Sequence, residues 1–229
     1  MFVIPSIDIL NGKCVQLING RIKTAEVYGT PKEYFKKWVS KDANIIHIVD
    51  LDAAFDLGSN KEIIFELIED GNAGIQVGGG IRNEEYACEL IEKGAKRIII
   101  GSKALDACFL KKLSKKIPKE QIMVALDIRS GDIVADGWRT NTGVKYKNGV
   151  KKIKSFIGSI LSTDVTCEGL LKGPNSELIK MLNQENIPTY ISGGFTTKSD
   201  IKLAEKIGFS GVIVGRALYK EKLDLEDLW

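Results

Sequence analysis

The stretch Val77-Gly78-Gly79-Gly80-Ile81-Arg82 decides the predicted fold of this chain. It follows a short apolar run and precedes a helical pattern that opens at Asn83. Glycines at such a turn let the backbone approach a ligand closely, with amide N–H groups free to face an anion. A near copy, Ile191-Ser192-Gly193-Gly194-Phe195, stands 114 residues later, counted from Gly79 to Gly193. A repeated turn of this kind predicts two anion sites rather than one.

Around these turns, apolar runs alternate with helical patterns. We expect eight strands, at 3–9, 45–50, 73–77, 97–100, 121–126, 159–163, 187–191 and 211–214. Strand–helix alternation implies parallel βαβ units, and eight of them fit an α/β protein of the TIM-barrel type. We therefore predict a single (β/α)8 barrel domain over residues 1–229. The alternative is an open doubly wound sheet, which usually offers one glycine-rich phosphate loop rather than two.

Two polar segments interrupt this pattern. The segment 10–29 is predicted as a mobile loop after the first strand, and 128–148 as an irregular loop or hairpin after the fifth. Asn60 is predicted to cap the helix that begins at Lys61.

The 114-residue spacing recurs in the pairs Asp50/Asp164, Gly80/Gly194, Gly94/Gly208 and Gly101/Gly215. Asp8 and Asp127 stand 119 residues apart in the similar contexts Ser6-Ile7-Asp8-Ile9 and Ala125-Leu126-Asp127-Ile128. The shared order predicts two half-barrel repeats, about 1–116 and 117–229.

Composition and charge restrict the class of protein. The chain is 44% hydrophobic and 28% charged, and its net charge of +3 is spread without a basic tract, so no nucleic-acid partner is expected. No apolar run is long enough for a membrane helix, and the first residues lack the basic start of a signal peptide. The cysteines are far apart and His47 is the only histidine. We therefore expect a cytoplasmic protein with no disulfide framework, metal or cofactor.

The carboxyl ends of the strands carry the candidate chemistry, because they face the active site in (β/α)8 barrels. Asp8 ends the first predicted strand and Asp127 the fifth, on opposite sides of the mouth. Two facing carboxylates can act as general base and general acid on one substrate. The alternative is that each aspartate only caps the loop that follows it.

Four glycine-containing turns are the candidate phosphate sites. Gly79-Gly80 and Gly101-Ser102 follow the third and fourth strands, and Gly193-Gly194 and Gly215-Arg216 follow the seventh and eighth. Each can offer backbone N–H groups and a helix N-terminus to a phosphate. The pairs predict a small-molecule substrate with a phosphate at each end. The alternative is that the glycines only make tight turns.

Several segments together resemble the ProFAR isomerase family of histidine biosynthesis, over essentially the whole chain. They are Ile4-Pro5-Ser6-Ile7-Asp8, His47–Asp52, Gly78–Arg82, Gly137-Trp138, Gly193-Gly194 and Val212–Leu218. The resemblance implies a half-barrel-repeat (β/α)8 enzyme that isomerises a bis-phosphorylated aminoaldose to an aminoketose by an Amadori rearrangement. It also implies that no obligate protein partner is needed.

The resemblance also implies roles for individual residues. Asp8 would remove the C2′ proton of the Schiff base, and Asp127 would protonate the ribose ring oxygen. Trp138 would stack on the imidazole carboxamide, or alternatively would anchor its loop to the barrel. Arg82 and the first loop would close over one end of the ligand, and Thr163 and Glu168 would contact it.

Two departures from the family pattern stand out. The family usually reads Arg-Asp-Gly-Thr after the sixth strand, where this chain has Cys167-Glu168-Gly169-Leu170, and Gln16 replaces an expected arginine. They predict weaker substrate binding. Three alternatives stay open: the cyclase subunit of imidazole glycerol phosphate synthase, an isomerase that also accepts phosphoribosyl anthranilate, and a degenerate barrel that only binds phosphorylated ligands. Gly80-Ile81-Arg82 and Gly137-Trp138 favour the isomerase over the cyclase.

Overall fold

A closed ring of parallel strands forms the centre of the protein. The computed structural model describes residues 1–135, 138–182 and 186–228. The ring runs through eight strands, β1 (Phe2–Leu10), β4 (Ile45–Asp50), β5 (Gly74–Gly78), β6 (Arg97–Ile100), β7 (Ile122–Arg129), β10 (Ser159–Asp164), β11 (Thr189–Ser192) and β12 (Gly211–Val214). It closes because β12 pairs with β1, with Phe2 opposite Gly211. The closure confirms the (β/α)8 barrel and excludes the open sheet.

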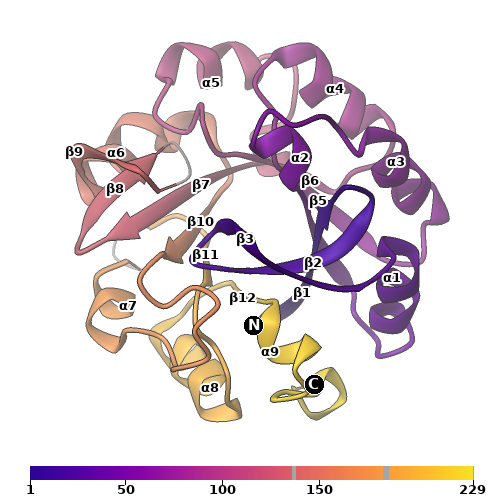
Figure 1. Ribbon diagram of the computed structural model, residues 1–229. Coiled ribbons are helices and arrows are strands. Elements are labelled where there is room, and N and C mark those ends of the chain that lie inside the picture. The colour runs from indigo at the N-terminus through magenta and orange to yellow at the C-terminus, as the bar shows by residue number, and fades with distance from the viewer. Residues whose placement is uncertain (136–137, 183–185, 229) are drawn as a thin grey trace.

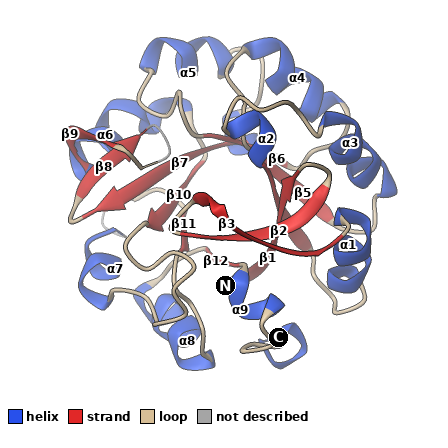
Figure 2. Cartoon of the chain, viewed as in Figure 1, coloured by secondary structure: helices blue, strands red, loops and turns tan. Residues whose placement is uncertain are grey.

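Helices cover the outside of the ring (Figures 1 and 2). They are α1 (Pro31–Val39), α3 (Lys61–Asp70), α4 (Glu84–Glu92), α5 (Ala107–Leu113), α6 (Tyr146–Ile153), α7 (Ser176–Leu182) and α8 (Lys198–Ile207), with the short α2 (Leu51–Ala54) and α9 (Arg216–Tyr219). Three short 3₁₀ helices lie at Lys119–Gln121, Lys154–Phe156 and Leu225–Leu228. Capping boxes at Thr30 and Thr197 fix the starts of α1 and α8 by satisfying free N–H groups.

Apolar side chains fill the inside of the barrel, so it is a packed core and not a channel. The inner cluster contains Ile4, Ile45, Ile99, Met123, Leu161, Tyr190 and Ile213. Three buried polar side chains join it: Gln76 bonds His47 Nδ1 at 3.1 Å and accepts from Arg97 at 2.6 Å. Because the interior is filled, a substrate can be bound only at the ends of the barrel.

The segment 10–29 is a β-hairpin, so the prediction of a mobile loop was wrong. Its strands are β2 (Lys13–Ile18) and β3 (Arg21–Gly29), and β2 pairs antiparallel with β1, with Asp8 opposite Val15. Figure 1 shows the hairpin lying across the ring. Residues 14–17 are all buried because β2 is covered on both faces. The apolar–polar alternation that would have predicted a strand is therefore missing.

A second hairpin extends β7 in the same way. Its strands are β8 (Asp132–Ala135) and β9 (Thr140–Lys145), and Asp127 lies opposite Val134. The hairpin alternative for 128–148 is confirmed up to Lys145, after which α6 begins. Each aspartate thus lies on the first strand of a three-stranded antiparallel unit, with a valine seven residues later as its partner.

Asn60 lies at the N-cap of α3, but its side chain makes no capping hydrogen bond, so that prediction was wrong in its mechanism. The amide instead donates to Asp50 at 2.7 Å and to Asp52 at 2.6 Å, and it accepts from the N–H of Gly12 at 3.1 Å. These buried bonds tie the start of the first hairpin to the end of β4. They hold that hairpin over the barrel.

Candidate active site

Asp8 and Asp127 lie on opposite sides of one barrel mouth. In the ring of eight, three strands separate β1 from β7 in either direction. The charges of both aspartates act on Glu168, on the segment that follows β10. The three carboxyl groups therefore lie near one another at this mouth.

Neutral groups hold the Asp8 carboxyl. Burial raises the pKa of Asp8 to about 7, and a hydrogen bond from Ser6 opposes this rise. Gln16, only 4% exposed, places its Nε2 3.3 Å from Asp8 Oδ2. A carboxyl group that titrates near neutral pH can accept a proton from a carbon acid.

Asp127 accepts hydrogen bonds from two side chains, Trp138 between β8 and β9 and Thr163 on β10. The indole Nε1 of Trp138 donates to its Oδ2 at 2.8 Å, and Thr163 also bonds to it. Ser192 donates to the Thr163 hydroxyl at 3.0 Å, which leaves the Thr163 hydrogen available for Asp127. Burial raises the pKa of Asp127, while these two hydrogen bonds lower it. A raised pKa suits a group that must be protonated before it reacts.

Glu168 lies near enough to both aspartates for their charges to act on it. Burial, together with the charges of Asp8, Asp127 and Asp164, raises its pKa to about 8. The backbone oxygen of Glu168 accepts from the N–H of Asn19 at 3.3 Å. A Cβ on the next residue, Gly169, would lie 2.6 Å from the backbone oxygen of Leu17. The segment after β10 therefore packs directly on the first hairpin.

The glycine turns after β5 and β11 are packed alike. Gly79 (φ +93°) and Gly193 (φ +104°) lie against the backbone of Asp50 and Asp164, and a Cβ on either would collide with a backbone oxygen there. Both residues are also left-handed, which glycine adopts without strain. Their neighbours Gly80 and Gly194 are similarly crowded, by Ala53 and Gly173. Tight packing accounts for these glycines, so phosphate binding needs support from other observations.

The turns after β6 and β12 differ from each other. Gly101 and Ser102 are exposed, and a Cβ on Gly101 would meet nothing within 4 Å. A Cβ on Gly215 would lie 2.6 Å from Gln16 Oε1 and 2.7 Å from Ser6 Oγ. Gly215 therefore gives Gln16 the room to reach Asp8.

The two predicted arginines hold loops. Arg82 donates to the backbone oxygens of Ala53 at 2.9 Å and Ala54 at 3.1 Å, and pairs with Asp56 at 2.9 Å. Arg216 donates to the backbone oxygen of Gly169 and lies 3.7 Å from Glu26 on β3. Arg82 thus caps the end of α2, and Arg216 joins the segment after β10 to the first hairpin.

Sequence reasoning did not single out three of these residues as site groups. Ser6 lies two residues before Asp8, hence on the same side of β1, and strand alternation could have found it. Ser192 adjoins the second glycine turn. Gly20, at the tip of the first hairpin, lies against Trp138. No sequence pattern pointed to this residue. Gly137, quoted in the resemblance, is outside the described residues.

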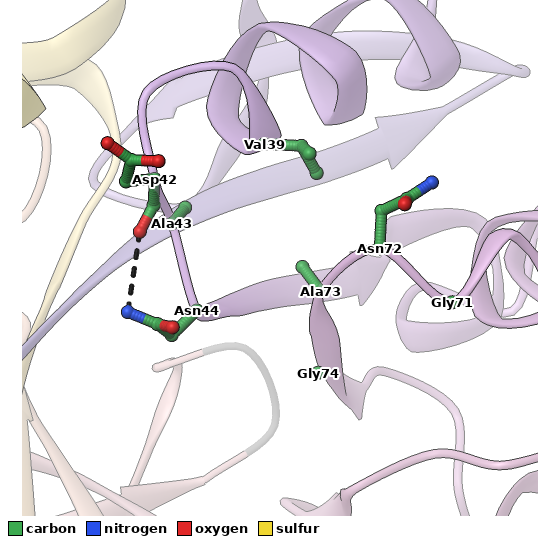
Figure 3. A pocket seen from close by; sticks show the side chains of 8 residues that line it. All are labelled: Val39, Asp42, Ala43, Asn44, Gly71, Asn72, Ala73 and Gly74. Carbon is green, nitrogen blue, oxygen red and sulfur yellow. Dashed lines mark hydrogen bonds between the residues drawn. The ribbon is translucent and has the colours of Figure 1, made fainter.

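A cavity of about 490 Å³ lies away from this mouth (Figure 3). It is lined by Val39, Asp42, Ala43, Asn44, Gly71, Asn72, Ala73 and Gly74, at the starts of β4 and β5. None of the predicted site residues lines it.

Within the described part of the chain, no group of histidine, cysteine, aspartate and glutamate side chains could hold a metal ion. The same residues include no helix long and apolar enough to cross a membrane.

Fold and mouth together define a class: a (β/α)8 barrel with two buried carboxyl groups on opposite sides of its mouth. The family model described as "Histidine biosynthesis protein" matches residues 2–224. A relative from Methanocaldococcus jannaschii is 42% identical over 99% of this chain and 97% of its own length. A relative from Methanothermococcus thermolithotrophicus is 44% identical over 99% of this chain and 98% of its own length. A relative from Methanosphaera stadtmanae is 42% identical over 99% of this chain and 98% of its own length. All three are named ProFAR isomerases, that is, isomerases of an imidazole-4-carboxamide with two phosphoribosyl groups. The chain belongs to the histidine biosynthesis protein family.

Proposed function

We propose that this protein isomerises the aminoaldose ProFAR to the aminoketose PRFAR in the cytoplasm, as a step of histidine biosynthesis. The observation that carries the proposal is the pair Asp8 and Asp127, which face each other across one mouth, each with a raised pKa. Relatives at 42–44% identity that bear this isomerase name support the choice of substrate.

The reaction begins with Asp127 in its acid form. It gives its proton to the ribose ring oxygen as the bond from that oxygen to C1′ breaks, and the nitrogen lone pair forms the C1′=N double bond. Asp8, ionised, then takes the proton from C2′, and the electrons of that C–H bond form the enaminol. Ketonisation moves the proton from Asp8 to C1′ and the C2′ hydroxyl proton to Asp127. Both groups return to their starting states.

The two phosphates would bind at the paired turns. The turns after β5 and β6 lie opposite those after β11 and β12 in the ring, which matches a substrate with phosphates at both ends. Gly101 supports this, since a Cβ added there would enter open space and its backbone conformation does not itself require glycine. Arg82 and Arg216 would contribute by fixing loops at the rim.

The charge at the mouth bears on the dual-substrate alternative. Asp8, Asp127 and Glu168 are all carboxyl groups, and the groups that hydrogen-bond to Asp8 and Asp127 are neutral. A substrate with its own carboxylate, such as phosphoribosyl anthranilate, would meet the ionised Asp8 and no positively charged partner among these groups. We therefore expect a strong preference for ProFAR.

A steady-state assay of the purified protein with ProFAR tests the proposal. Turnover without added glutaminase subunit supports the isomerase over the cyclase. Binding without turnover at saturating ProFAR would instead support the degenerate barrel, and comparable rates with phosphoribosyl anthranilate would support the dual-substrate enzyme.

A further inference from the structure

Gly20, at the tip of the first hairpin, lies against Trp138, whose indole reaches Asp127. A Cβ built on Gly20 would lie 2.8 Å from Cζ3, 3.0 Å from Cε3 and 3.2 Å from Cη2 of Trp138. Real Cβ contacts are almost never this short. Any side chain at position 20 would therefore have to displace the indole, or be displaced by it.

The opposite edge of the same indole touches the site. Its Nε1 donates to Asp127 Oδ2 at 2.8 Å, and the backbone oxygen of Trp138 accepts from Arg129 at 3.0 Å. The ring thus lies between Gly20 and Asp127. A shift imposed from the Gly20 side would lengthen or tilt the bond to Asp127, and such bonds weaken steeply with distorted geometry.

The hairpin tip is itself fixed from a second direction. Asn19 donates its N–H to the backbone oxygen of Glu168 at 3.3 Å, and Leu17 lies against Gly169. Arg216 holds Gly169 from the other side. Gly20 therefore cannot withdraw without disturbing the segment that carries Glu168.

We propose that Gly20 is a positioning residue for Asp127, acting through Trp138: its bare Cα lets the indole lie close enough to hold the carboxyl. An indole N–H can only donate, so it favours the form of Asp127 with the proton on Oδ1. Contact with Gly20 thereby selects which oxygen delivers the proton. This rests on the proposed function in one respect, that Asp127 is the acid.

The chain supplies a matched control. Gly143 on β9 has φ +68°, against +64° for Gly20, but a Cβ there would meet nothing within 4 Å. Alanine at either position imposes the same left-handed backbone strain, and only at Gly20 does it also meet the ring. Gly20→Ala and Gly143→Ala are compared by steady-state isomerisation of ProFAR. Acrylamide quenching of the Trp138 fluorescence is compared as well. The Trp138 fluorescence is the part of the emission that Trp138→Phe removes.

We expect Gly20→Ala to lower kcat by about tenfold or more, because small misplacements of reacting groups are costly, and to increase quenching of Trp138. Gly143→Ala should keep both within about twofold of wild type. In a Trp138→Ala background, Gly20→Ala should cause no further loss beyond about twofold, as a double-mutant cycle requires when one residue acts through the other.

The proposal would be overturned if kcat fell equally in the two glycine variants. It would also be overturned if Gly20→Ala still lowered kcat in the protein that lacks Trp138. If Gly20→Ala does not fold, Gly20→Asn replaces it, with Gly143→Asn as its control, because asparagine tolerates left-handed backbone. The same criteria then apply. Wild-type protein that fails to turn over ProFAR would refute the proposed function, whereas the quenching comparison would still decide whether Gly20 seats Trp138.

Discussion

The indole Nε1 of Trp138 lies 2.8 Å from Oδ2 of Asp127 and donates a hydrogen bond to this proposed acid. The bond favours the charged form of Asp127 and therefore lowers the pKa of its carboxyl, against the larger effect of burial. Trp138 thus contributes to both the position and the acidity of the Asp127 carboxyl.

Trp138→Phe removes the indole donor and keeps an aromatic ring. The pKa of Asp127 should rise, so the alkaline limb of kcat/KM against pH, where the acid loses its proton, should move to higher pH. Thr163→Val removes the second donor and should move the limb the same way. The check is a pH profile of each variant; limbs that stay in place in both would show that Asp127 is not the titrating acid.

Gln16→Arg places a cation beside Asp8, where a neutral amide now lies 3.3 Å away. An opposite charge at that distance favours the carboxylate, so the pKa of Asp8 should fall below about 7. The acid limb of kcat/KM should accordingly move down by about one pH unit or more. Gln16→Leu, which adds no charge, controls for lost packing. An acid limb that does not respond to Gln16→Arg would remove Asp8 from the role of base.

Glu168→Gln should make stability less dependent on pH. The pKa of Glu168 is raised on folding to about 8, so its contribution to stability is present below about 4.5 and is lost as pH rises through about 8. Removing this carboxyl should raise Tm relative to wild type at about pH 9 and change it little at about pH 5. In a chain of this size each 1 kcal/mol corresponds to roughly 2–4 °C. Glu66→Gln, at an exposed position on α3, serves as control. A Tm difference equal at both pH values would contradict the account of Glu168.

Gly101→Ala separates phosphate binding from folding. Its Cβ would enter open space, so unfolding free energy should stay within about 0.5 kcal/mol of wild type. If the turn faces a phosphate, the added methyl should raise KM for ProFAR several-fold, roughly tenfold at most. Gly79→Ala should instead lower Tm, because Gly79 is left-handed and lies against the backbone of Asp50. An unchanged KM in Gly101→Ala would exclude this turn from the binding site.

The barrel could be predicted from the sequence because buried parallel strands appear as nearly continuous apolar runs, as in Ile45–Val49. The hairpin β2–β3 could not be predicted in this way. The inner strand is buried on both faces from Cys14 to Leu17. The exposed positions of β3 are Arg21, Lys23 and the apolar Val27, so neither strand shows a clean apolar–polar alternation.

The candidate site was predictable at the strand ends and not in the loops above them. Asp8 and Asp127 follow from strand order alone. The contact of Gly20 with Trp138 joins two hairpins far apart in sequence, and only their three-dimensional crossing brings the residues together. The raised pKa of Glu168 likewise depends on its burial and then on three carboxyls from separate strands.

The half-barrel repeat stays a prediction, which the structure supports by matched contacts. Asp8 and Asp127 face Val15 and Val134, and both pairs of equivalent positions are 119 residues apart. Gly79 and Gly193 lie against Asp50 and Asp164, each 114 residues from its counterpart.

Steady-state kinetics of Asp8→Asn and Asp127→Asn with ProFAR test the central claim most directly. Each variant keeps the shape of its side chain and loses the proton-transferring carboxyl. The account predicts that kcat falls by about 10²-fold or more in each, while affinity for a bis-phosphorylated product analogue is largely retained. Near-normal turnover in either variant would contradict the assigned role of that aspartate.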